Sequence, residues 1–159
     1  MSFKINVMIK FPPLIPPKFP EKYIIYTQRR YSSFNSKIAD IKTGELVGEM
    51  STYIPVSQSV FYISKLLSFR RNQGIGTIFV NLAKKMCEEY VGKKPLYVLA
   101  SSMYDKKNPP FLFYKKMGFE PMDCPEHILK HLNECIKEHK QVDTNIINED
   151  IFMIYKGNK

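Results

Sequence analysis

The amino-acid sequence predicts a mixed α+β protein with more strands than helices. Apolar and polar residues alternate in several short segments, which is the period of a half-buried strand, and the apolar period becomes helical after Gly74 and Gly76. The chain has 159 residues, of which 44% are hydrophobic, and this fits one globular domain with a sizeable core. We therefore expect a single domain over residues 1–159.

Most of the strands are predicted in the N-terminal half of the chain. Residues 3–11 alternate as a strand does, and the five prolines between residues 12 and 20 predict an extended connector because proline cannot donate a ladder hydrogen bond. Further strands are expected at residues 23–31, 38–41, 46–50 and 60–67. Gly44 supplies the positive φ that a hairpin between the strands at 38–41 and 46–50 needs.

Helices and short strands alternate in the second half. A helical face over residues 75–90 is formed by Ile75, Ile78, Phe79, Leu82, Ala83, Met86 and Tyr90. After a buried strand at 96–100, Asn108 can cap a helix that begins at Pro109, and Gly118 would end that helix in the left-handed region. Phe119 starts another strand, and 151–155 is the last one. Between them, Asp123 and Glu126 resemble a capping box for a helix over 125–141.

Composition favours a cytoplasmic protein without a membrane partner. No window of about 18 mostly apolar residues exists, and Lys4 and Lys10 interrupt the apolar residues that a signal peptide would need. The three cysteines (Cys87, Cys124 and Cys135) contain no C-x-x-C pair, so a disulfide framework is not expected.

The net charge of +9 indicates attraction to polyanions such as nucleic acid or a phosphorylated cofactor. The lysines are spread along the chain, which is typical of a solvated surface rather than of a binding stripe. No nucleic-acid partner is therefore expected, and a basic nucleic-acid-binding protein stays an alternative that rests on charge and aromatic content alone.

The segment at residues 66–77 carries the most information about function, because it is a strand that runs into a glycine turn and then a helix. Gly74 and Gly76 let anionic oxygens approach the main chain, and the free amides at a helix N-terminus point toward such an anion. Arg70 and Arg71 add positive charge at the rim. The pattern fits a diphosphate, although the same glycines can simply turn a strand into a helix.

The order of strand, R-x-x-G-x-G and helix resembles the acyl-CoA signature of the GNAT superfamily of N-acyltransferases. The resemblance covers about residues 60–120, because a second strand and Asn108 precede the run F-Y-K-K-M-G-F at 113–119, which is similar to the family's tyrosine, lysine and glycine-phenylalanine ending. It implies a GNAT-like fold, with a central, mostly antiparallel twisted sheet of about seven strands flanked by helices, a shortened N-terminal helical region and an extra helix before the last strand.

The resemblance also implies an enzyme that uses acetyl-CoA as co-substrate and transfers the acetyl group directly to a primary amine in a ternary complex. The main chain of Leu66 and Leu67 would bind the pantetheine arm. The pyrophosphate would be held by residues of the turn and the first helical turn, namely Arg71, Asn72, Gln73, Gly74, Ile75, Gly76 and Thr77. Tyr114 corresponds to the tyrosine that protonates the departing thiolate, since a phenol keeps its proton at neutral pH; an aromatic core residue is the alternative. Asn108 lies six residues before Tyr114, where the family has seven, so it is either a cofactor-binding residue or only a helix cap.

A general base is harder to identify. The accepting amine must lose a proton before it attacks, yet no Asp or Glu occurs between Met50 and Cys87. Asp105 and Glu49 are the nearest candidates by topology, and both are also read as surface carboxylates. A water chain with no single base is equally consistent. The missing base supports a second reading, a catalytically inactive GNAT-like module that binds CoA.

The helix at 125–141 carries a polar stripe of His127, His131, Cys135 and His139 at four-residue steps. Neighbouring members of the stripe lie one turn apart, but the whole stripe is too long for one ion and its neighbours are apolar, so no metal is expected. The two helices that wall the acceptor site in the family are missing, so we expect an unusual acceptor site. A protein amine, an amino sugar and a small metabolite remain open as acceptors, and a homodimer is compatible with the sequence.

Overall fold

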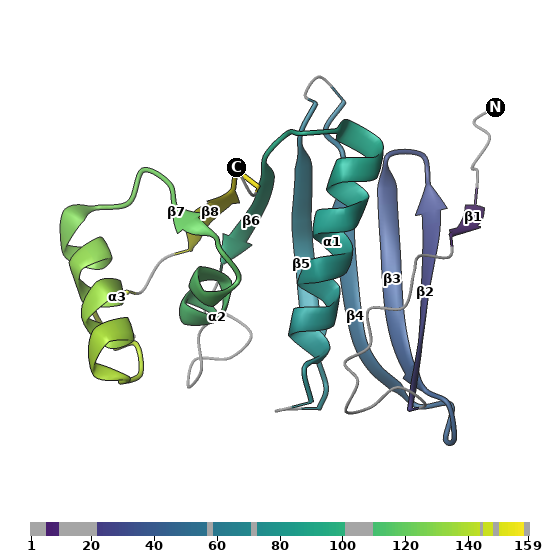
Figure 1. Cartoon of the computed structure of the whole chain (residues 1–159), viewed down its shortest axis with the longest axis horizontal. Coiled ribbons are helices and arrows are strands. Elements are labelled where there is room, and N and C mark those ends of the chain that lie inside the picture. Colours follow the sequence, from purple (N-terminus) through teal and green to yellow (C-terminus); the bar gives the residue numbers. More distant parts are fainter. Residues whose placement is uncertain are drawn as a thin grey trace. The chain divides into compact units, whose positions relative to one another are not determined.

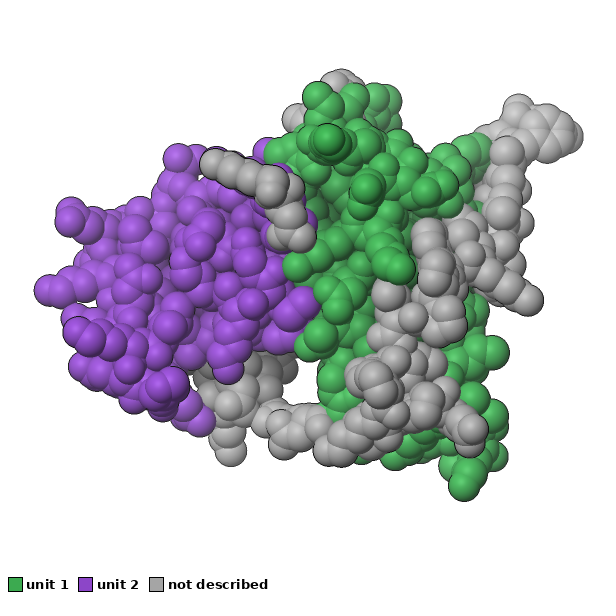
Figure 2. Space-filling view, viewed as in Figure 1, with its two compact units in different colours: residues 1–96 green, residues 97–159 purple. Residues whose placement is uncertain are grey.

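The computed structural model describes residues 6–9, 22–56, 59–70, 73–100, 110–143, 145–147 and 150–157. The chain divides into two compact units, Met1–Leu96 and Tyr97–Lys159 (Figure 2). Both units contain fully buried aromatic side chains, for example Phe79 in the first and Phe119 in the second.

The first unit contains five strands that pair antiparallel in chain order (Figure 1). The strands are β1 (Asn6–Ile9), β2 (Tyr23–Arg30), β3 (Ser33–Asp40), β4 (Leu46–Tyr53) and β5 (Phe61–Ser68). The β3–β4 hairpin predicted from Gly44 is confirmed, and this glycine has a φ of +72°. The proline-rich segment between β1 and β2 lies outside the described residues.

Helix α1 (Ile75–Val91) packs on β4 and β5, with the apolar face that the sequence predicts. Gly48 on β4 allows the start of the helix to approach the strand closely. A Cβ atom at this position would lie 2.6 Å from Ile75 Cγ2 and 2.7 Å from Phe79 Cε2. The first turn of α1 therefore rests directly on the backbone of β4.

The last turn of α1 is held by an aromatic cluster on the same sheet. The ring of Tyr90 lies 4.9 Å from that of Phe34 on β3, and the ring of Phe34 lies 5.7 Å from that of Phe61 on β5. The Arg29 guanidinium lies over the rings of Tyr90 and Phe34, 5.0 and 5.4 Å from their centroids. Together with the contact at Gly48, these contacts fix both ends of α1 relative to the strands.

The second unit alternates strands and helices. Its elements are β6 (Leu96–Ala100), whose first residue belongs to the first unit, α2 (Phe111–Lys116), β7 (Glu120–Pro121), α3 (Glu126–Glu138) and β8 (Ile151–Tyr155). Strand β8 lies between β6 and β7, and it pairs antiparallel with β7. Gly118 ends the turn after α2 with a φ of +94°, as its sequence position predicts. No described helix is long and apolar enough to cross a bilayer.

Three sequence predictions differ from the structure. Helix α2 begins at Phe111 and the residue before its first turn is Pro110, so the predicted start at Pro109 with Asn108 as the cap is wrong. Asp123 does not cap α3, because the residue before its first turn is Pro125, and no side chain makes a cap hydrogen bond there. Strand β3 begins at Ser33, five residues before the predicted start at Ile38. The early part of β3 was missed because a buried serine, Ser36, occupies a core position, where its hydroxyl is hydrogen bonded to that of Thr27 at 2.8 Å.

Candidate functional site

The start of α1 leaves main-chain N–H groups without helical acceptors. Gly74 precedes the helix in a left-handed conformation, with φ +74° and ψ +15°, which glycine adopts without steric cost. The helical hydrogen bonds begin with the N–H of Ile78, which donates to Gly74 O at 3.0 Å. The N–H groups of Ile75, Gly76 and Thr77 therefore have no acceptor within the helix, and the first turn carries no acidic side chain. Such a helix start can bind a phosphate through main-chain donors.

A β-bulge lies on β5 shortly before this helix. The register with β4 shifts between Ser51 and Thr52, which leaves Ser64 as the extra residue on β5. The Ser64 hydroxyl donates to Ser51 O at 3.1 Å. Bulges bend a strand and often occur beside active sites. Leu66 and Leu67, the residues expected to bind a pantetheine arm, lie between this bulge and the glycine turn.

Glu49 lies opposite Leu67 in the β4–β5 register. Its carboxylate accepts hydrogen bonds from Asn35 Nδ2 at 3.0 Å and from Lys65 Nζ at 3.4 Å. The Asn35 hydrogen bond, followed by the contact with Lys65, lowers the pKa of Glu49. A lower pKa makes this carboxylate a weaker proton acceptor than an ordinary glutamate. Its role as a general base stays a prediction, and these contacts do not favour it.

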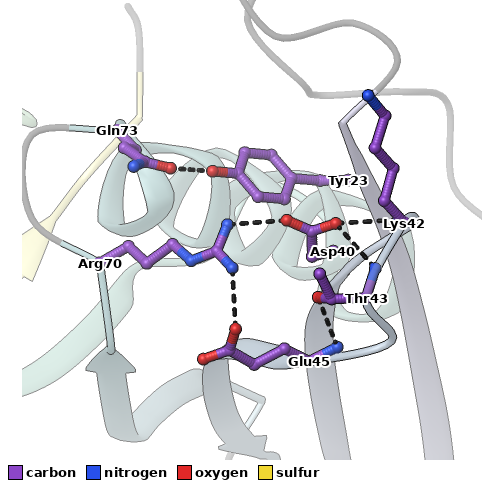
Figure 3. Close-up of polar contacts among 7 residues, drawn as sticks. All are labelled: Tyr23, Asp40, Lys42, Thr43, Glu45, Arg70 and Gln73. Carbon is purple, nitrogen blue, oxygen red and sulfur yellow. Dashed lines mark hydrogen bonds and ion pairs between the residues drawn. The ribbon is translucent and has the colours of Figure 1, made fainter.

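Arg70 forms ion pairs with two carboxylates, so it does not add unpaired positive charge beside the glycine turn. This corrects the expectation from its position in the sequence. Its Nη1 lies 2.9 Å from Asp40 Oδ2, and its Nη2 lies 3.0 Å from Glu45 Oε2 (Figure 3). The side chain of Asp40 is only 8% exposed, whereas that of Glu45 is 64% exposed. The guanidinium also lies 6.0 Å from the ring centroid of Tyr23. The charge of Arg70 is thus balanced within the protein.

Asp40 uses both of its carboxylate oxygens. While Oδ2 binds Arg70, Oδ1 accepts the main-chain N–H groups of Lys42 at 2.9 Å and of Thr43 at 3.2 Å. The hydrogen bond from Arg70 is the main cause that lowers the pKa of Asp40, and the two N–H groups act in the same direction. Sequence reasoning missed this contact because 30 residues separate its partners and no local pattern links them.

The side chain of Gln73 is hydrogen bonded to a buried residue of β2. Its Oε1 accepts a hydrogen bond from the Tyr23 hydroxyl, on a tyrosine that is 2% exposed (Figure 3). Gln73 directly precedes Gly74, so the contact anchors the chain at the point where the helix start is formed.

Tyr114 belongs to the second unit and is 5% exposed. Its ring makes an edge contact with Phe119 at 5.5 Å, and the N–H of Phe119 donates to Tyr114 O at 2.9 Å. Burial raises the pKa of Tyr114 far above its ordinary value, so the phenol keeps its proton. The side chain is therefore chemically able to donate a proton, and its surroundings also suit a core aromatic residue.

Arg71, Asn72, Asp105 and Asn108 lie outside the described residues. No group of three or more metal-binding side chains is found in the part of the chain that the structure describes.

The polar stripe on α3 separates into a buried pair and two exposed histidines, His127 and His139. In the buried pair, Cys135 Sγ lies 3.6 Å from His131 Nε2, and that nitrogen accepts the N–H of Asp143 at 2.9 Å. The buried half of the stripe therefore anchors the chain that follows α3.

Comparison with known proteins identifies the fold. No protein-family model matches the sequence, and no curated protein sequence matches it. The PaiA N-acetyltransferase from Thermoplasma acidophilum, solved in complex with coenzyme A, matches with a TM-score of 0.54 and 15% identity over 79% of this chain. Nourseothricin acetyltransferase matches with a TM-score of 0.52 and 14% identity over 84% of this chain and 82% of its own. Naa50 from Arabidopsis thaliana, in complex with the bisubstrate analogue CoA-Ac-MVNAL, has a TM-score of 0.50 and 20% identity over 78% of this chain and 72% of its own.

The matched structures are acetyltransferases, and the match spans 62% of the PaiA chain. Mostly antiparallel strands flanked by helices, with a glycine turn between β5 and α1, are the features that the sequence resemblance implied. The protein has the GNAT acyl-CoA N-acyltransferase fold.

Proposed function

We propose that the protein is an N-acetyltransferase that transfers an acetyl group from acetyl-CoA to a primary amine by direct transfer in a ternary complex. The start of α1 is the observation that carries this proposal: a left-handed Gly74 followed by three main-chain N–H groups without helical acceptors. Solved proteins of this fold, among them PaiA, were crystallised with coenzyme A.

The residues around this helix start fit such a co-substrate. The N–H groups of Ile75, Gly76 and Thr77 would bind its pyrophosphate, with the main chain of Gln73 and with Arg71 and Asn72 before them. The β5 main chain at Leu66 and Leu67 would pair with the pantetheine arm. We assign a further contact to Asn108. When bound, acetyl-CoA supplies an activated acetyl thioester.

Tyr114 is proposed as the proton donor to the leaving thiol, because its buried phenol stays protonated at physiological pH. On the acceptor side, the amine has to lose a proton to Asp105, Glu49 or water. The lowered pKa of Glu49 makes it a weaker proton acceptor than an ordinary glutamate, so it does not single out Glu49 among these three. Positioning of the amine against the thioester would then contribute most of the rate enhancement.

Thiol release tests this proposal directly. Acetyl-CoA is incubated with the protein and panels of peptides, amino sugars and small amines, and free thiol is measured. We expect release with at least one acceptor class. Tyr114→Phe should lower kcat about 100-fold while CoA affinity stays unchanged, because only a hydroxyl is lost. Absence of both turnover and CoA binding in the wild-type protein would refute the proposal.

An inactive CoA-binding module is the second candidate. The pairing of Glu49 with Asn35 and Lys65 favours it, since this nearby carboxylate is committed to other partners. Calorimetric binding of CoA without thiol release for any acceptor would support this reading, and turnover that depends on Tyr114 would exclude it.

A further inference from the structure

Both ends of the loop between β5 and α1 are tied to the same corner of the first unit. Arg70, at the β5 end, binds Asp40, and Gln73, at the α1 end, accepts a hydrogen bond from Tyr23 (Figure 3). Tyr23 and Asp40 are register partners on β2 and β3, so the two ties meet side by side. The Arg70 guanidinium, 6.0 Å from the Tyr23 ring, connects them.

We infer that Tyr23, Asp40, Glu45, Arg70 and Gln73, here called the Arg70 cluster, position this loop for the acetyl-CoA site. The inference rests on the proposed function. The members of the cluster act as positioning residues, because they fix the path of the main chain into Gly74 and so the direction of the N–H groups that follow. A site whose donors are held in place before binding has less conformational entropy to lose when its ligand arrives.

The turn between β3 and β4 makes Asp40 a rigid anchor for Arg70. Its Oδ1 is held by two main-chain N–H groups, and the N–H of Gly44 donates to Asp40 O at 2.8 Å. The second carboxylate partner, Glu45, is largely exposed, and exposed ion pairs contribute little. The contact of Asp40 with Arg70 is partly buried and charge-assisted, so it should carry most of the positioning effect.

A role in positioning and a role in supplying charge predict opposite effects for Asp40→Asn. The substitution removes a negative charge close to a site for a polyanion. If only net charge mattered, CoA affinity would rise. If the cluster positions the loop, affinity falls. Asparagine keeps a side-chain oxygen for the N–H groups of Lys42 and Thr43, so the turn itself should persist.

The experiment combines two measurements on the full chain. Amide hydrogen exchange in the first hydrogen-bonded turn of α1, which begins with the bond from Ile78 N–H to Gly74 O, is followed without ligand, and the Kd for CoA is measured by calorimetry. For Asp40→Asn and Arg70→Lys we expect about tenfold faster exchange and about tenfold weaker binding, the size of one lost charged hydrogen bond. Lysine keeps the charge of Arg70 but lacks the planar fork that contacts both carboxylates. Tyr23→Phe, which removes only the hydroxyl, should act in the same direction.

Glu89→Gln is the matched control, because it removes the same charge from an exposed position near the other end of α1. It should change neither quantity. Tighter CoA binding by Asp40→Asn, or wild-type exchange and affinity in Arg70→Lys, would overturn the inference. If the wild-type protein does not bind CoA, the proposed function fails, while the exchange rates still decide whether the cluster orders the loop. If Asp40→Asn does not fold, Arg70→Lys and Tyr23→Phe give the same decision.

Discussion

At the scale of single residues, a pair of polar side chains is buried in the core of the first unit. Thr27 and Ser36 are register partners on β2 and β3, both fully buried, with their hydroxyl oxygens 2.8 Å apart. Each hydroxyl is the hydrogen-bond partner of the other, whereas a single buried hydroxyl without a partner would destabilise the folded state.

We expect Thr27→Val to lower the free energy of unfolding by about 1–3 kcal/mol, because it leaves the Ser36 hydroxyl buried without a partner. Adding Ser36→Ala should recover a large part of this loss. Urea unfolding of the two single variants and the double variant measures the coupling. Additive losses in the double variant would show that the hydroxyl pair does not act as a unit.

The same pair shows what a sequence pattern can miss. The strand predicted from the sequence starts at Ile38 and does not include Ser36. Its burial depends on a threonine nine residues away, which local alternation does not reveal. The contact of Arg70 with Asp40 was missed for the same physical reason.

At the scale of elements, the prediction was most accurate where one period runs through many residues. Helix α1 begins at Ile75 as predicted and ends at Val91, one residue beyond the predicted face, because its apolar positions repeat over four turns. The predicted N-cap of α3 was wrong, because an N-cap depends on the identity of a single residue. Pro125 occupies the position before the helix, and Asp123 lies too early in the chain.

The contact between β4 and α1 gives a prediction of its own. Gly48→Ala should destabilise the protein by about 1–3 kcal/mol, because a Cβ atom would lie too close to Ile75 and Phe79. It should also weaken CoA binding, since the helix start must move. Thermal unfolding and calorimetry measure the two effects.

Gly92→Ala, at the other end of α1, is the control for this prediction. It introduces backbone strain at a φ of +75°, but its Cβ would meet no atom within 4 Å. It should therefore lower the Tm and leave CoA affinity unchanged. Equal loss of affinity in both variants would argue against a specific effect of the contact between Gly48 and the helix.

At the scale of the whole molecule, acid stability should depend on the contact of Asp40 with Arg70. The pKa of Asp40 is lower in the folded protein than its ordinary value of 3.8. A lowered pKa means that the ionised carboxylate stabilises the folded state, fully above that ordinary value and progressively less as the pH falls through the lower folded value. The groups that face it are Arg70, Glu45 and Tyr23.

We expect Asp40→Asn to unfold at lower urea concentration than the wild-type protein at pH 7. The difference should shrink as the pH falls below about 4, where the wild-type carboxyl also loses its charge. Urea midpoints of both proteins between pH 7 and pH 3 measure this. A gap that is constant across the range would contradict the assignment.

The fold and the glycine turn before α1 were predictable because each is encoded by neighbouring residues: alternation for strands, a helical period for α1, and two glycines at a strand–helix junction. The acceptor was not predictable, because its recognition depends on side chains brought together from distant positions. The net charge of +9 does not identify the acceptor either, since Arg70 shows that an arginine beside the motif can be neutralised by carboxylates within the fold.

The helix start after Gly74 has a consequence for how the protein tolerates change. Its donors belong to the peptide backbone, which every amino acid except proline provides. Most replacements of the side chains at positions 75–77 would therefore leave these donors in place. Loss-of-function variants should instead gather at Gly74, whose left-handed conformation strains other residues, and at Gly48, where a Cβ atom would meet the helix.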